Sequence, residues 1–162
     1  MSSVTVNRDK PNLGHTETAN LVKKAIFAVL KAENIGEDCH VDVLLTDDEG
    51  IHAINLEHRG VDAPTDVLSF PMNELTPGAF DPDLCEVDFA TGEIMLGDMV
   101  IDIPRCEVQG REFGHGYKRE VSYLAVHSTL HLLGYDHLDE GPEKALMRER
   151  EDAIMESLNI LR

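Results

Sequence analysis

The feature that most constrains the fold is a fixed spacing of three histidines around one glycine: His127, His131, Gly134 and His137. Two histidines four residues apart lie on one face of an α-helix, because the helix has 3.6 residues per turn. Gly134 can adopt a left-handed backbone conformation at little cost, so it can end that helix and turn the chain back. The spacing therefore predicts a helix followed at once by a tight turn, which brings His137 to the other two imidazoles.

Three imidazoles that converge on one point form a metal site. Three protein ligands leave a fourth position for water, which is typical of catalytic zinc sites and not of closed structural ones. A lone histidine on a helix is more often an ordinary core or surface residue. With eight histidines in the chain, however, this spacing arises by chance in only roughly 2% of cases, so we favour the metal site. We expect one zinc ion, although a three-imidazole site also accepts nickel or copper.

The same spacing matches the metzincin protease signature H-E-x-x-H-x-x-G-x-x-H at every position but one. Ser128 stands where the signature has glutamate. In a metalloprotease that glutamate is the general base that acts on the metal-bound water. The sequence therefore predicts a metzincin-like metal-binding helix that works by a different chemistry.

Composition predicts one domain over residues 1–162, because a chain of this length with 42% hydrophobic residues can bury a single core. No apolar stretch approaches the roughly 20 residues of a membrane span, and the first residues lack the pattern of a signal peptide. The three cysteines are odd in number and form no C-x-x-C pair, which indicates free thiols in a reducing compartment. We therefore expect a cytoplasmic protein without a membrane partner or cysteine ligands.

The net charge of −17 argues against a nucleic-acid partner, since affinity for phosphates comes largely from clustered Lys and Arg. Screening limits this argument: at physiological salt acidic groups more than about 8 Å away have little influence on a local cleft. Six acidic residues lie between positions 140 and 156. Basic residues occur in other elements, and the sequence does not show whether they meet in space.

Hydrophobic periodicity divides the chain into strands and helices. We expect strands at 4–6, 39–45, 66–72 and 93–103, and helices at 16–33, 46–59, after Pro104, 117–133 and 142–158. Thr46 to Glu49 reads as a capping box at the start of the second helix, and Pro71 suits an edge strand or a strand end. Residues 73–92 have little periodicity and form a long loop. The predicted fold is α+β: a mixed four-stranded sheet packed with about five helices.

Three blocks of the sequence together resemble the bacterial YbeY family: Arg59 followed by PTDVLSFP at 64–71, LGDMVID at 96–102, and the histidine motif. The resemblance spans most of the chain. The family usually has glycine where this sequence has Ser128, a change that adds a hydroxyl near the ion without removing a ligand.

This resemblance implies a metal-dependent, single-strand-specific endoribonuclease that acts in 3′-end maturation of small-subunit ribosomal RNA and in ribosome quality control. Its implied partners are single-stranded ribosomal RNA, the small ribosomal subunit and the assembly factors of that subunit. It also implies that His127, His131 and His137 bind zinc, and that Arg59 is the functional arginine of the cleft. A guanidinium and a metal can jointly stabilise charge on a phosphoryl group. From the residues alone, we favour the interpretation of Arg59 as a solvated residue at a helix end, by about two to one.

Several residues near these blocks have two interpretations. Asp98 and Asp136 are candidates to accept the second N–H of metal-bound histidines, or are turn residues. Thr65 and Ser69 contact phosphate or simply belong to the strand, and we favour the strand. The nucleophile is a water or a ribose 2′-hydroxyl.

Two other functions compete with the ribonuclease. One is a metalloprotease or other metallohydrolase with a non-nucleic-acid substrate, which the metzincin-like spacing and the acidic surface favour and Ser128 opposes. The other is a non-enzymatic ribosome-assembly factor, in which the metal only fixes a helix to the turn that follows it.

Overall fold

A mixed sheet of four strands forms the centre of the molecule in a computed structural model, which describes residues 1–136 and 141–160. The strand order is β1-β2-β4-β3. The three strands β1 (Ser3–Arg8), β2 (Cys39–Thr46) and β4 (Ile94–Asp102) are parallel, and β3 (Val67–Pro71) pairs antiparallel with β4 at one edge. The predicted α+β class with a mixed four-stranded sheet is therefore confirmed, and Pro71 ends the edge strand as expected.

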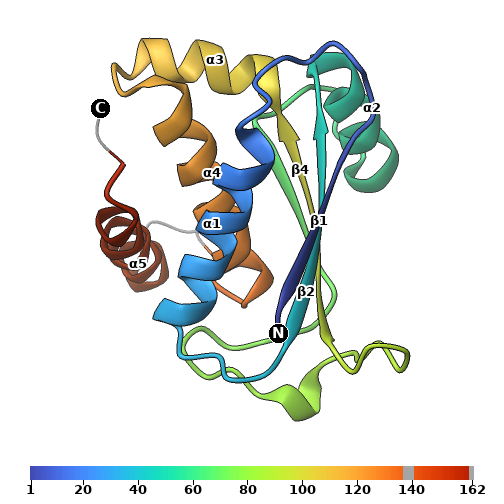
Figure 1. Cartoon of the computed structure of the whole chain (residues 1–162), viewed down its shortest axis with the longest axis vertical. Coiled ribbons are helices and arrows are strands. Elements are labelled where there is room, and N and C mark those ends of the chain that lie inside the picture. The colour runs from blue at the N-terminus through green and yellow to red at the C-terminus, as the bar shows by residue number, and fades with distance from the viewer. Residues whose placement is uncertain (137–140, 161–162) are drawn as a thin grey trace.

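The described part of the chain forms five α-helices around the sheet, the number that the sequence predicted (Figure 1). One face is covered by α1 (Thr18–Ala32) and α4 (Gly116–Leu132), and α5 (Pro142–Leu158) packs outside these two. The other face carries α2 (Asp48–Arg59), while α3 (Ile103–Glu112) follows β4 directly and packs against α4. Thus α4 lies between the sheet and α5, which makes it the central helix.

The alternation of side chains along the strands separates two cores. In β4, Met99 and Ile101 belong to the large core beneath α1, α4 and α5, whereas Val100 packs with Ile51 of α2 and Leu68 of β3 in a small cluster on the opposite face. After Gly97, a residue of β4 at an even position therefore faces α2, and one at an odd position faces α4; before the irregularity at Gly97 the alternation is reversed, and Ile94 and Leu96 belong to the large core.

The start of α2 corrects one detail of the sequence analysis. The predicted capping box is wrong, because Thr46 is the last residue of β2 and its buried hydroxyl donates to Asp9. The N-cap is Asp47, whose carboxylate accepts from the Gly50 amide 2.9 Å away. Either residue type can cap a helix; the continuation of the parallel pairing up to Thr46 decides between them.

The long loop contains more local structure than predicted. Between β3 and β4 lie the short 3₁₀ helix η1 (Pro82–Leu84) and two isolated β-bridges, Thr76 with Ala79 and Val87 with Ile94. The three cysteines are free thiols, as expected. None of the helices within residues 1–136 and 141–160 is long and apolar enough to cross a bilayer.

Candidate active site

His127 and His131 lie one turn apart in the second half of α4, with their Nε2 atoms 3.1 Å from each other. Two nitrogen ligands of one tetrahedral zinc ion, each about 2.0–2.1 Å from the metal, are about 3.3 Å apart. The two imidazoles are therefore spaced as two ligands of a single ion.

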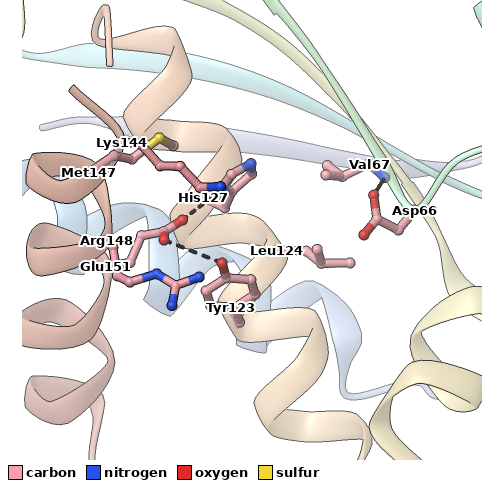
Figure 2. A pocket seen from close by; sticks show the side chains of 9 residues that line it. All are labelled: Asp66, Val67, Tyr123, Leu124, His127, Lys144, Met147, Arg148 and Glu151. Atoms are coloured by element: carbon pink, nitrogen blue, oxygen red, sulfur yellow. Dashed lines mark hydrogen bonds and ion pairs between the residues drawn. The ribbon is translucent and has the colours of Figure 1, made fainter. Parts of the chain in front are cut away.

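The other nitrogen of each ring is held by an oxygen. His127 Nδ1 lies 2.5 Å from Oε2 of Glu151 on α5, and His131 Nδ1 lies 2.8 Å from the carbonyl oxygen of Tyr135. Tyr123 donates to the second oxygen of the same Glu151 carboxylate at 3.2 Å, and burial raises the pKa of this phenol, so that it stays a donor (Figure 2). Carbonyl and carboxylate oxygens accept hydrogen bonds, so both histidines carry their proton on Nδ1.

This tautomer leaves the two Nε2 lone pairs aimed at the same point. Two lone pairs 3.1 Å apart repel unless a proton or a cation lies between them, so the donor set fits a metal ion. Within residues 1–136 and 141–160, no three His, Cys, Asp or Glu side chains are close enough to hold an ion together. The third predicted ligand, His137, lies outside the described residues.

Gly134 forms the turn that follows α4, as its place in the motif predicted. Its φ is +100°, and a β-carbon there would lie 2.2 Å from the carbonyl oxygen of Leu75. Only glycine fits both the conformation and the contact. The next residue, Tyr135, donates its amide to the Leu130 carbonyl and its phenol to Glu33 at the end of α1. The turn is thereby fixed in the orientation that presents the Tyr135 carbonyl to His131.

A cleft of about 680 Å³ opens beside the histidine pair. The end of α2, residues 65–75, both histidines and the turn 134–136 supply its walls. Arg59 is the last residue of α2, exposed and at the rim of this cleft, and Gly60 ends the helix there in a left-handed conformation. The structure thus brings Arg59 to the same cleft as His127 and His131, although 67 residues separate Arg59 from His127 in the sequence.

Ser128, between the two histidines in the sequence, packs against the sheet. It is fully buried, and its hydroxyl lies 2.7 Å from that of Ser69 on β3. The hydroxyl is therefore engaged with β3, and the expectation that it lies near the ion stays a prediction. Ser69 lines the cleft and also joins β3 to α4, which supports the strand interpretation. Thr65 lies in the cleft wall as well.

The two predicted carboxylate partners of the histidines have different outcomes. Asp98 lies at an even position of β4, in a hollow on the α2 face together with Asp42, so its assignment to the metal site is wrong. Burial raises the pKa of Asp98, and the negative charge of Asp42 adds to this effect. Asp136 lines the cleft, and its partnership with a histidine stays a prediction. The residue that the sequence analysis missed is Glu151.

Comparison with known proteins points to one family. The family model described as Endoribonuclease YbeY matches residues 3–159. Similar proteins of that description include one from Agathobacter rectalis, 47% identical over 147 residues, which covers 88% of either chain. Another, from Clostridium botulinum, is 40% identical over 162 residues and covers 96% of this chain and 97% of the relative.

The fold is also similar to a solved structure. A protein of Thermotoga maritima, known from its solution structure, superposes with a TM-score of 0.62 at 29% sequence identity. The match covers 96% of this chain and 89% of the other.

Proposed function

The chain belongs to the YbeY endoribonuclease family, and from this premise we propose that it cleaves single-stranded ribosomal RNA at a zinc ion held by His127, His131 and His137. The whole chain, residues 1–162, acts as one domain in 3′-end maturation of small-subunit RNA and in ribosome quality control, with the small subunit and its assembly factors as partners. The observation that carries the proposal is the pair of Nε2 atoms 3.1 Å apart at the wall of a cleft that Arg59 also lines.

The protein residues have separate tasks in this reaction. Glu151 and the Tyr135 carbonyl hold the two described imidazoles with Nε2 toward the cleft, so no rotation of the rings is needed when a ligand binds. Arg59 stands at the rim, where its guanidinium can donate two parallel hydrogen bonds to a phosphate. The chemistry that the ion supplies is Lewis-acid polarisation of a phosphoryl oxygen and a lowered pKa for a water molecule.

Arg59 contributes to the transition state in which negative charge develops on the phosphoryl oxygens. A donor preorganised at that point typically contributes about 10²- to 10³-fold in kcat. The exposed position of Arg59 at the end of α2 leaves its donors accessible to substrate. A lysine at the same place would keep the charge but not the paired donors, so Arg59→Lys is expected to recover only part of the activity.

The test is cleavage of a single-stranded ribosomal RNA fragment by the wild-type protein, by an H127A/H131A/H137A variant and by the control variant His52→Ala, whose histidine lies exposed on α2. The wild type and the control cleave the RNA, chelation stops the reaction, and zinc restores it. The triple variant is inactive while its far-ultraviolet circular dichroism stays native. Intact RNA combined with chelator-sensitive peptide cleavage would overturn the proposal in favour of a protease.

The ends of the products identify the nucleophile. A 2′,3′-cyclic phosphate shows attack by the ribose 2′-hydroxyl, whereas a 5′-phosphate shows attack by water.

The role of the metal is tested separately in cells. If His131→Ala loses its metal but keeps its fold and normal ribosomal RNA processing, the metal is structural and the catalytic proposal is wrong. Elemental analysis of untagged protein identifies the ion, which the chemistry of three imidazoles leaves open among zinc, nickel and copper.

A further inference from the structure

A second hollow of about 320 Å³ lies on the other side of His127 (Figure 2). It shares Asp66, Val67 and His127 with the cleft described above, so the two hollows adjoin at the histidine. Its remaining walls come from α4 and α5. A polymer whose reacting phosphate sits at His127 therefore has room to continue in both directions.

Two basic side chains of α5 line the hollow, beside Met147 and Glu151 of the same helix. Lys144 and Arg148 both line the hollow, and they are four residues apart, which puts them on one face of the helix. Arg148 is exposed, and among the described residues no carboxylate lies within 4.0 Å of its guanidinium. Only 14 of the 162 residues are Lys or Arg, and two of them meet here, next to a candidate metal ligand.

The acidic residues of the same hollow are already engaged. Both oxygens of Glu151 are occupied, one by His127 and the other by the Tyr123 hydroxyl, and its side chain is 6% exposed. Asp66 accepts from the Val67 amide through one oxygen and from a glutamine amide through the other. Both carboxylates keep their charge but are fixed by these hydrogen bonds, whereas Arg148 is exposed and its guanidinium can reach a phosphate.

We propose that this hollow is a subsite for the sugar–phosphate backbone of the RNA strand, with Arg148 and Lys144 contacting a phosphate next to the one that is cleaved. The inference rests on the proposed ribonuclease function. It places Arg59 on one side of the histidine pair and the α5 cations on the other, so that the strand is held on both sides of the reacting phosphate. Cations then lie on both sides of the histidine pair, in a chain whose net charge is −17.

The experiment measures kcat/KM on a single-stranded RNA oligonucleotide with Arg148→Ala, Lys144→Ala and the double variant, all loaded with zinc. The control is Arg111→Ala, an exposed arginine on α3, which removes the same charge at a distance. Each exposed phosphate contact contributes about two- to fivefold, so the double variant loses about tenfold and the control changes less than twofold. Arg148→Lys keeps the charge and recovers most of the loss.

Salt dependence separates a phosphate contact from a structural effect. A plot of log(kcat/KM) against log[salt] becomes shallower by about 0.7 for each phosphate contact removed from a single strand, and the Arg111 control keeps the wild-type slope. If wild-type protein cleaves RNA and the Arg148 and Lys144 variants keep its rate and slope, the subsite is refuted and the ribonuclease function stands. If wild-type protein cleaves no RNA, the proposed function itself has failed.

Discussion

Glu151 provides the sharpest test of how the histidine pair is organised. Its carboxylate is buried and accepts from His127 Nδ1 and from the Tyr123 hydroxyl. Glu151→Ala removes one hydrogen bond between a charged acceptor and His127, and such a bond contributes about 1.5–3 kcal/mol. Because this bond raises the basicity of a metal-binding imidazole, its loss is expected to raise the dissociation constant for zinc by about 10- to 100-fold.

Glu151→Gln gives a graded version of the same change. The glutamine carbonyl can still accept from His127, and its amide can donate to the Tyr123 oxygen, so the connections survive without the charge. Charged hydrogen bonds are about twice as strong as neutral ones. The free-energy loss is therefore about half as large, which corresponds to roughly three- to tenfold in the dissociation constant.

The assay is competition for zinc between the apoprotein and a chromophoric chelator, with thermal unfolding followed in parallel. The control is Glu149→Gln on the same helix, whose side chain is exposed and which should bind zinc as the wild type does. If Glu151→Ala unfolds, Glu151→Gln still tests the argument. Zinc affinity within twofold of the wild type in folded Glu151 variants would show that this carboxylate stabilises the packing of α5 and does not position His127.

Three further predictions concern the surroundings of the site. Ser128→Ala loses the hydrogen bond between the Ser128 and Ser69 hydroxyls and should lower the free energy of unfolding by about 1 kcal/mol, with unchanged zinc affinity. A large loss of zinc affinity would place the hydroxyl at the ion. Gly134→Ala, which puts a β-carbon 2.2 Å from the Leu75 carbonyl oxygen, should destabilise by more than about 1 kcal/mol and weaken zinc binding; an unchanged melting temperature contradicts this. Asp102, the last residue of β4, caps α3 by accepting from the Arg105 amide, and burial raises the pKa of its carboxyl to about 8. The native state therefore holds this proton, and stability falls as pH rises from about 4 to about 8. Denaturant titrations should show a flatter pH profile of stability for Asp102→Asn, which keeps the helix cap, and a profile identical to that of the wild type rules the explanation out.

The secondary structure was predictable because most elements depend on local patterns. The helices at 16–33 and 142–158 follow from apolar residues at helical spacing, and the observed α1 and α5 lie within one or two residues of those limits. The error at the start of α2 has a different origin. Both Thr46 and Asp47 can cap a helix, and the choice depends on how far β2 pairs with β4, which is a contact between distant segments.

The residues of the candidate site also divide into those that a local sequence pattern predicted and those that depend on contacts between distant segments. His127 and His131 were found because their four-residue spacing is a local geometric fact, whereas the place of Arg59 in the cleft rested on the family resemblance and not on any pattern. Glu151 did leave a signal in the sequence: it occupies the apolar face of α5 between Met147 and Ile154, where an unpaired charge is costly. A glutamate at such a position indicates a buried partner, but the sequence does not say that the partner is a histidine on α4.

The last helix supports His127 and His131 through two consecutive residues. Glu151 holds one imidazole directly. Its neighbour Arg150 lies 3.5 Å from the Glu33 carboxylate, which accepts the Tyr135 phenol, and the Tyr135 carbonyl holds the other imidazole. Side chains of adjacent helical residues diverge by about 100°. One helix can therefore contact both His127 on α4 and Glu33 at the end of α1 only when it packs across α1 and α4 together. The metal-binding geometry therefore depends on the docking of α5, and a variant that loosens this helix should weaken zinc binding without altering any ligand.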